Sequence, residues 1–436
     1  MTEVGRTRAP AAAAAAERRK ARGAAERAVP AATRARLDDL LAATDAELRR
    51  RGVIRLHAPA AAPARPGRGS RRAAGTAGAA SRQAGTSAAP GGGGGRGPGR
   101  AGAAPRGVPE APAAELLSPV LARAAAHAGA ALVSNMAGQG ARFLEEMASR
   151  RLLDPEVAAN LAEFSRRAGA VRRSHHDGSD RVDDFGFDAE WTEALLPLAR
   201  LAYRKWWRVT TTGIANVPAE GGALLVSNHS GVLPLDGAMI KVAAFEEGLE
   251  RHIRALIATW FFGLPVLSWF LRRSGQTVGH QDDTHRLLTS GELVLVFPEG
   301  VKGTGKLYRE RYRLRRFGRG GFVAVAIRAR VPLVPVSVVG AEEIYPMIAD
   351  VRPLAELLGM PYFPITPTWP LLGPVGLVPL PSVWRITFHP PVRTDVLPPE
   401  AADDPSEVMR VSDEVQATIQ DGLIADLMER RSVFRS

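Results

Sequence analysis

The chain has 436 residues, a formal net charge of +12 and no cysteine, which excludes disulfide bonds, thiolate metal ligands and a cysteine nucleophile. The charge is uneven. Residues 1–107 hold 21 of the 57 basic and 7 of the 45 acidic residues, so this part carries +14 and the remainder −2. The basic character therefore belongs to the N-terminal quarter.

Residues 1–110 are rich in Ala, Gly, Pro and Arg and poor in aromatic and branched apolar residues. Such a stretch cannot bury enough surface to offset chain entropy, so we predict a disordered basic tail. The tail either binds anionic lipid or is simply solvated. The sequence contains no basic cluster interleaved with aromatic residues, so a nucleic-acid partner is not expected. Within the tail, residues 37–51 predict a short isolated helix, with acids early and arginines late.

No apolar stretch follows the first charges, so we expect no secretory signal and a cytoplasmic protein. Residues 111–175 have helical spacing and predict a small helical segment, in which Asp154-Pro155 is a typical helix start.

From residue 185 the pattern changes to short apolar strands that alternate with helices. We predict strands at residues 223–228, 292–296, 331–340 and 384–392, and helices at 190–207, 236–245, 320–329 and 407–431. This alternation is typical of an α/β fold with a mostly parallel sheet flanked by helices. One domain is therefore expected over residues 185–436.

The stretch VSNHSGVLPLD, residues 226–236, carries the first chemical signal. His229 directly follows a buried strand, at the edge where open α/β sheets bind ligands. Asp236 begins the next helix. A histidine oriented by a carboxylate is a common general base for a hydroxyl. The alternative is a structural turn histidine beside a helix-capping aspartate.

Two long stretches, residues 255–271 and 362–383, contain no charged residue. Gly-Leu-Pro interrupts the first and several prolines interrupt the second, so neither provides the roughly 20 apolar residues of a spanning helix. They are either core and buried loop, or an interfacial patch or acyl tunnel in which Trp, Tyr and Phe lie at the headgroup boundary.

Four blocks in order, NHSGVLPLD, LSWFLRRSG, FPEG and VPLVPVSV, resemble the glycerolipid acyltransferase family that includes lysophosphatidic acid acyltransferases. The resemblance covers about residues 185–396. The run FGRGGFVAVAIRARVPLVPVSVVGAEE is also similar to the diacylglycerol acyltransferase relatives of that family. The resemblance implies an acyltransferase-type sheet in the predicted α/β domain.

The resemblance also implies transfer of a fatty acyl group from acyl-CoA or acyl carrier protein to a lipid hydroxyl, without a covalent intermediate, cofactor or metal. A lysophospholipid such as 1-acylglycerol-3-phosphate is the first expected acceptor, which would place the protein in phospholipid biosynthesis. Diacylglycerol or another neutral alcohol is the alternative, and a non-catalytic lipid-binding protein is another. The membrane surface is an expected partner, with the protein peripheral on the cytoplasmic face.

Residue roles follow from the same resemblance. His229 and Asp236 are the expected catalytic residues, with His229 as base and Asp236 orienting it. The expected substrate-binding residues are Asn228, Arg272, Arg273, Phe297, Pro298, Glu299, Gly300 and Lys302. Glu299 has an alternative role as a turn-stabilising carboxylate. The basic run at residues 306–319 either binds phosphate or anionic membrane, or is a solvated face.

The chain departs from the family pattern in two places. Six residues separate His229 from Asp236 where the family has four, so the loop around Pro234 must bulge outward for the carboxylate to reach the histidine. Val301-Lys302 replaces the usual Thr-Arg, and a lysine binds a phosphate only as a point charge.

A second histidine motif, HHDGSD at residues 175–180, resembles the His-His-x-x-x-Asp pattern of condensation-domain-like acyltransferases. The glycine that usually follows the aspartate and the long surrounding scaffold are both missing. We interpret this motif as an exposed loop between domains.

Overall fold

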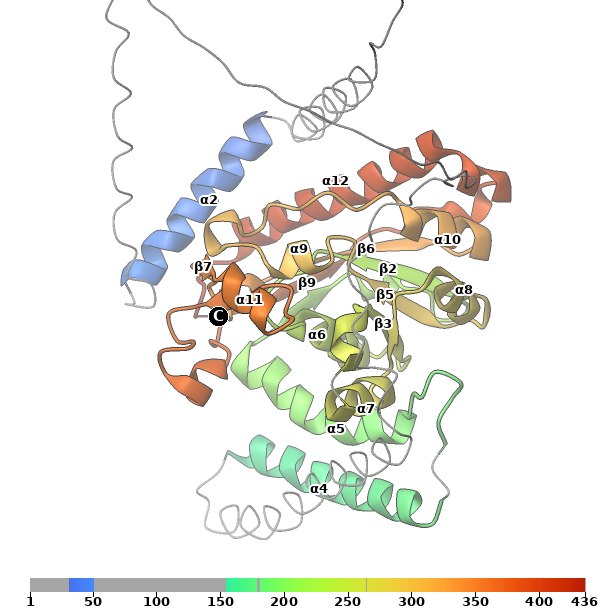
Figure 1. Ribbon diagram of the computed structural model, residues 1–436, viewed down its shortest axis with the longest axis horizontal. Helices are drawn as coiled ribbons and strands as arrows, with labels where there is room; N and C mark the ends of the chain where they lie inside the picture. The colour runs from blue at the N-terminus through green and yellow to red at the C-terminus, as the bar shows by residue number, and fades with distance from the viewer. Residues whose placement is uncertain (1–30, 51–153, 179–180, 264, 436) are drawn as a thin grey trace, which may run out of the picture. The chain divides into compact units, whose positions relative to one another are not determined.

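The computed structural model describes residues 31–50, 154–178, 181–263 and 265–435 (Figure 1). In these ranges a seven-stranded sheet has the order β1-β9-β6-β2-β5-β3-β4. Neighbouring strands are parallel except β6 and β9. The strands are β1 (Thr210–Thr212), β2 (Ala223–Ser227), β3 (Ile253–Ile257), β4 (Gln276–Val278), β5 (Leu293–Val296), β6 (Leu333–Val339) and β9 (Arg385–Phe388).

A separate two-stranded sheet pairs β7 (Ala349–Asp350) with β8 (Pro364–Ile365). The α-helices of the described ranges are α2 (Ala31–Arg50), α4 (Pro155–His176), α5 (Ala189–Leu201), α6 (Leu235–Glu246), α7 (Pro265–Arg273), α8 (Gln281–Thr289), α9 (Val301–Thr304), α10 (Gly321–Ala329), α11 (Arg352–Leu357) and α12 (Pro405–Glu429). The predicted mostly parallel α/β fold is therefore confirmed.

The hydrophobic core lies on both faces of the sheet. Strand β2 is buried along its whole length, and its side chains alternate between the two faces. Leu224 and Val226 join a cluster with α8, α10 and α12, whereas Ala223 and Leu225 join a second cluster with α6. Burial on both faces explains why the strands read as continuous apolar runs in the sequence.

The helices between parallel strands bring the chain back to the amino edge of the sheet. As a result, β2 and β5 end side by side, with Val226 paired to Val296 in register. The loops that follow these two strands therefore meet at the carboxyl edge, where α/β proteins place their ligands. The predicted strand ends at residues 228 and 296 lie at this edge.

The short helix predicted at residues 37–51 is present as α2, but the expectation that it is isolated is wrong. Leu37 and Leu41 are buried in the cluster formed with α10 and α12. The Arg311 guanidinium donates a hydrogen bond to the Leu41 carbonyl oxygen at 2.8 Å. The apolar side of α2 is therefore packed against this core cluster. The other residues of the predicted tail lie outside the described ranges.

The end of the predicted small helical segment, α4, packs against α5. Val171 of α4 contacts Trp191 and Ala194 of α5 in a small buried cluster. Asp154 caps α4 by accepting hydrogen bonds from the N–H groups of Glu156 and Val157, as the Asp-Pro signal predicts. Residues 111–153 lie outside the described part of the chain. Among the described helices, none combines the length and apolar character needed to cross a bilayer.

Candidate active site

The loops after β2 and β5 bring the predicted catalytic residues together. His229 Nδ1 lies 2.8 Å from Asp236 Oδ2, so the histidine and carboxylate are directly hydrogen-bonded. Asp236 is fully buried, and 14% of the His229 side chain is exposed. With Nδ1–H donating to the carboxylate, the lone pair of the imidazole is at Nε2. No described residue hydrogen-bonds Nε2, which is therefore open to a substrate.

The longer His-to-Asp spacer is absorbed by an outward bulge. Gly231 has a φ of 77°, a left-handed conformation that favours glycine, and Leu233 protrudes into solvent. Pro234 precedes α6, which places Asp236 in the first helical turn. Asp236 also accepts hydrogen bonds at 2.8 Å from the N–H groups of Ser230 and Gly237. These contacts fix the carboxylate in spite of the extra residues.

Phe297 and Glu299 support the histidine from the β5 loop. The Phe297 ring stacks on the His229 ring, with centroids 4.2 Å apart. The Glu299 carboxylate accepts hydrogen bonds from the His229 N–H at 3.0 Å and the Arg315 N–H at 2.7 Å. Its side chain is completely buried. The expected contact of Glu299 with a head group is therefore not seen, and its turn-stabilising alternative describes the geometry.

Lys306 lies between two carboxylates beneath this loop. Its Nζ is 3.4 Å from Glu299 and 3.0 Å from Glu342, and only 2% of its side chain is exposed. Burial opposes the charged amine, but the two carboxylates outweigh burial and raise the Lys306 pKa. Burial raises the Glu342 pKa, and the charge of Lys306 and the Tyr312 N–H offset this only in part. Lys306 therefore remains a buried ammonium that joins two acidic side chains.

Gly303 allows the β5 loop to approach the histidine. A Cβ at this position would lie 2.8 Å from the Glu299 Cβ and 2.9 Å from both the Cβ and the backbone oxygen of His229. Gly300 has a φ of 55° and makes the turn into α9. Sequence reasoning identified Gly300 but missed Gly303, although the glycines of VKGTGK were visible signals of a tight approach.

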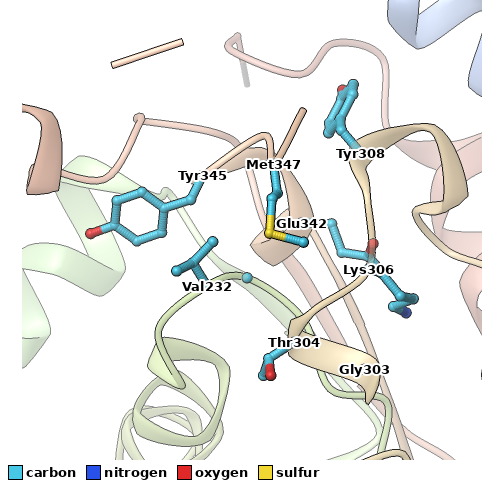
Figure 2. Close-up of a pocket in the computed structure, with 9 residues that line it drawn as sticks. Val232, Gly303, Thr304, Lys306, Tyr308, Glu342, Tyr345 and Met347 are labelled. Atoms are coloured by element: carbon cyan, nitrogen blue, oxygen red, sulfur yellow. The ribbon is translucent and has the colours of Figure 1, made fainter. Parts of the chain in front are cut away.

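A small pocket opens beside the histidine loop (Figure 2). Val232, Tyr345 and Met347 form one wall, and Thr304 and Lys306 line another, as Figure 2 shows. Lys306 is the only basic side chain among the described lining residues. Lys306 lay in the predicted basic run, but its pairing was not foreseen. Glu342, Tyr345 and Met347 were not predicted, because they follow β6, far along the chain.

Asn228 stabilises the sheet next to the site. Its amide donates to the Val338 carbonyl at 3.0 Å and accepts from the Val338 N–H at 2.8 Å. The side chain is fully buried between β2 and β6. Both of its groups thus form hydrogen bonds that clamp β6 next to the end of β2, which precedes His229, and the substrate contact of Asn228 stays a prediction.

Arg272 and Arg273, two of the expected substrate-binding residues, do not line the pocket beside the histidine loop. They end α7, which runs back from the carboxyl edge to the start of β4, whereas His229 follows the end of β2. Arg273 Nη1 lies 2.5 Å from Asp188 Oδ2 and 2.7 Å from His175 Nε2. The Arg272 guanidinium is over the Phe262 ring at 4.7 Å. Neither arginine faces the pocket that Gly231 and Gly303 line.

The HHDGSD motif does not form the expected exposed loop at its start. His175 and His176 are instead the last residues of α4, and His175 Nε2 lies 3.1 Å from Asp188 Oδ2. Residues 179 and 180 lie outside the described ranges. The His175 contacts connect α4, α5 and α7, as expected of a histidine with a structural role.

Lys302 is the remaining predicted cation near the pocket. It is exposed on α9, the helix that begins directly after Pro298, Glu299 and Gly300. No described residue forms an ion pair with it. The basic run at residues 306–319 divides into several roles. Arg311 is buried, Arg313 and Arg315 pair with Asp38 and Glu310, and other members are exposed. In the described ranges there is no cluster of three His, Asp or Glu residues that could hold a metal.

The chain is similar to several known proteins. The family model described as Acyltransferase matches residues 208–339. An uncharacterized protein of Mycobacterium tuberculosis is 49% identical over 277 residues, which are 63% of this chain and 77% of that protein. The Bos taurus "DGAT1/2-independent enzyme synthesizing storage lipids" is 27% identical over 165 residues, 38% of this chain and 48% of that protein.

A solved structure was also found, the 1-acyl-sn-glycerophosphate acyltransferase PlsC of Thermotoga maritima. It matches with a TM-score of 0.36 and 18% sequence identity, over 55% of this chain and 83% of that chain.

Proposed function

Because this chain belongs to the glycerolipid acyltransferase family, we propose that it transfers a fatty acyl group from a thioester to a lipid hydroxyl. The observation that carries the proposal is the 2.8 Å hydrogen bond from His229 Nδ1 to the buried Asp236, at the carboxyl edge of the sheet. This contact leaves Nε2 as the basic nitrogen, and a small pocket adjoins the histidine loop.

In the proposed reaction, His229 Nε2 removes the proton of the acceptor hydroxyl as its oxygen attacks the thioester carbonyl. A carbon–oxygen bond forms and the carbon–sulfur bond breaks. The departing thiolate takes the proton from Nε2, which restores the neutral histidine. Asp236 holds the tautomer and stabilises the transient imidazolium, and Phe297 and Glu299 position the ring and its backbone. No residue is acylated.

We propose an uncharged acceptor, such as diacylglycerol, in preference to the lysophospholipid that the motifs first suggest. The ammonium of Lys306, which lines the pocket, is already shared by Glu299 and Glu342. Arg272 and Arg273 do not line the pocket, since Arg273 is paired with Asp188 and Arg272 lies over the Phe262 ring. The name of the bovine relative, which refers to storage lipids, is in line with a neutral product. Lys302 is the feature that supports the phosphate-bearing alternative.

Acyl-CoA and acyl carrier protein remain the two proposed donors, since both present a thioester on the same phosphopantetheine arm. The exposed Arg309, Arg316 and Arg319 are candidate partners for donor phosphates or for an acidic carrier surface. We propose that the protein acts at the cytoplasmic face of a membrane, where both acceptor and donor are present.

The test is acyl transfer from radiolabelled acyl-CoA by the purified full chain, with diacylglycerol, a long-chain alcohol and lysophosphatidic acid as acceptors. His229→Ala is the catalytic variant, and His175→Ala is the matched control in a second histidine–carboxylate pair. We expect a labelled neutral lipid with wild type and control, and a loss of about 10²–10⁴-fold in His229→Ala.

Each outcome has a defined meaning. Equal transfer by wild type and His229→Ala would contradict the general-base mechanism. Product on lysophosphatidic acid alone, weakened by Lys302→Ala, would favour the phospholipid alternative. If no acceptor yields product, the assay is repeated with acyl carrier protein as donor, and a second negative result favours a non-catalytic lipid-binding protein.

A further inference from the structure

One segment of the chain exposes many large apolar side chains. Between β6 and β9 the chain makes an excursion, closed at its base by the hydrogen bond from Leu380 N–H to Ile344 O at 3.0 Å. Leu371 is 85% exposed, Leu357 80% and Val375 67%. The other exposed apolar residues of this excursion are Ile348, Leu358, Leu372, Leu377 and Val378. Exposed apolar groups at this density mark an interaction surface.

The hydroxyl groups of residues 362–382 that form hydrogen bonds are turned toward the protein itself. The Tyr362 hydroxyl donates to the Val232 carbonyl at 2.8 Å, and the Thr368 hydroxyl donates to the Gly376 carbonyl at 3.1 Å. Thr366 and Ser382 are hydrogen-bonded inside as well. From residue 357 to residue 384 there is no Asp, Glu, Lys or Arg. The outer surface is therefore apolar and offers few hydrogen-bonding side chains.

This composition distinguishes a bilayer from a protein as the covering partner. A protein interface typically contains about one hydrogen bond per 100–200 Å² and a polar rim. Here the apolar side chains extend from turns and from the short helix α11, which also exposes Arg352 and Glu356 at its base. Lipid chains offer no hydrogen-bond partner, so they suit a surface whose exposed side chains are mostly apolar and that lies at the boundary of the bilayer.

The excursion is also joined directly to the candidate active site. Tyr362 bonds to Val232 in the histidine loop, and its ring would lie 3.1 Å from a Cβ at Gly305. Tyr345 and Met347, at the base of the excursion, line the pocket (Figure 2). Leu233, in the bulge between His229 and Asp236, is exposed on this loop too. A lipid bound to the excursion would thus be near the pocket.

Trp206 adds an aromatic side chain at the end of the excursion. Its indole N–H donates to the Pro379 carbonyl at 3.0 Å, while the side chain remains partly exposed. Lys205 and Arg208 flank it in the sequence. Tryptophan with neighbouring basic residues is typical of the boundary between lipid headgroups and acyl chains.

We propose that residues 348–378 are a docking surface that inserts its leucine and valine side chains into the bilayer and brings the pocket to the lipid acceptor. The proposal rests on the proposed function for its biological purpose, but the binding itself can be measured without activity. It gives a role to the longer of the two candidate interfacial stretches and to the outward bulge at Leu233.

The test is flotation of the purified full chain with neutral phosphatidylcholine vesicles, which removes attraction by the basic tail. The docking variant is Leu357→Ser, Leu371→Ser and Val375→Ser combined. The matched control is Val182→Ser, Val396→Ser and Met428→Ser, three exposed apolar positions outside the excursion. We expect wild type and control to float equally, and the docking variant to bind at least about tenfold more weakly. Circular dichroism checks that all three are folded.

Several outcomes would overturn the proposal. These are no binding by wild type, equal binding by wild type and docking variant, and an equal loss in the control. A wild-type dimer in sedimentation that the docking variant dissociates, without vesicle binding, would assign the surface to a second copy. Acyl transfer in detergent micelles separates the proposed docking surface from the proposed enzymatic function. Transfer without vesicle binding rejects only the docking surface, and vesicle binding without transfer rejects only the enzymatic function.

Discussion

Two histidine–aspartate pairs in this protein have nearly the same hydrogen bond and opposite surroundings. His229 and Asp236 are 2.8 Å apart, and His175 and Asp188 are 3.1 Å apart. In the second pair, Arg273 contacts both the carboxylate and the ring nitrogen. In the first pair, no Lys or Arg of the described ranges pairs with Asp236, and a pocket lies alongside.

From this difference we expect a histidine–carboxylate pair to act as a base where the carboxylate charge is reserved for the histidine. Asp236 can stabilise an imidazolium at His229 because no permanent cation competes for it. At Asp188 the guanidinium of Arg273 already supplies the positive charge. The first pair is suited to proton transfer and the second to holding three helices together.

The largest expected effect separates the pairs by activity. Asp236→Asn keeps the shape of the side chain but removes the charge that fixes the histidine tautomer, so kcat should fall by about 10²–10⁴-fold. The measurement is acyl transfer under saturating substrate. An Asp188→Asn enzyme should retain kcat at a temperature where both variants are folded. If Asp188→Asn lost as much activity as Asp236→Asn, the comparison would fail.

The next effect separates them by stability. Arg273→Met leaves Asp188 as a buried carboxylate without a permanent cation, with only His175 and the Trp191 N–H as partners, so the free energy of unfolding should fall by roughly 3 kcal/mol. Urea denaturation, followed by tryptophan fluorescence, provides the measurement. Asp236→Asn serves as the reference with a smaller expected loss. A stable Arg273→Met protein with reduced kcat would instead return Arg273 to the substrate site.

A third change tests how closely the β5 loop supports His229. Gly303→Ala would force a methyl group into contact with His229 and Glu299, with an expected loss of stability of about 1–3 kcal/mol and a lower kcat. The control is Gly318→Ala, on an open turn where an added Cβ meets no atom within 4 Å. Gly318 has a positive φ, so the control also measures the backbone strain alone. Equal kcat in both variants would show that the close approach does not position the histidine.

The smallest expected effect is on acid stability. Burial opposes ionisation of Asp188, but the hydrogen bonds from His175 and the Trp191 N–H, together with the Arg273 charge, lower its pKa below the usual value. A carboxylate with a lowered pKa contributes stability above its unfolded-state pKa, and this contribution is lost as pH falls through the folded-state pKa. Wild type should therefore lose more unfolding free energy than Asp188→Asn between about pH 5 and pH 2. Parallel losses would contradict the assignment.

Much of the fold could be predicted because it depends on local pattern. Apolar runs such as residues 223–227 and 333–339 are short, continuous and separated by helical segments, and both became central strands. The same pattern placed His229 and Phe297 at strand ends. Chain topology then requires those ends to meet at one edge of the sheet, so the catalytic pair was within reach of sequence reasoning.

The sequence by itself thus determined the α/β class and the position of the histidine loop, and it identified His229 as the candidate base. The tertiary structure alone decided which charged residues remain available to a substrate. Asp188 captures Arg273, and Glu299 and Glu342 share Lys306, across separations of 85, 7 and 36 residues along the chain. Local periodicity carries no information on such pairs, because their energies depend on distance and burial after folding. Those distances determine whether a basic residue binds a ligand or another part of the protein.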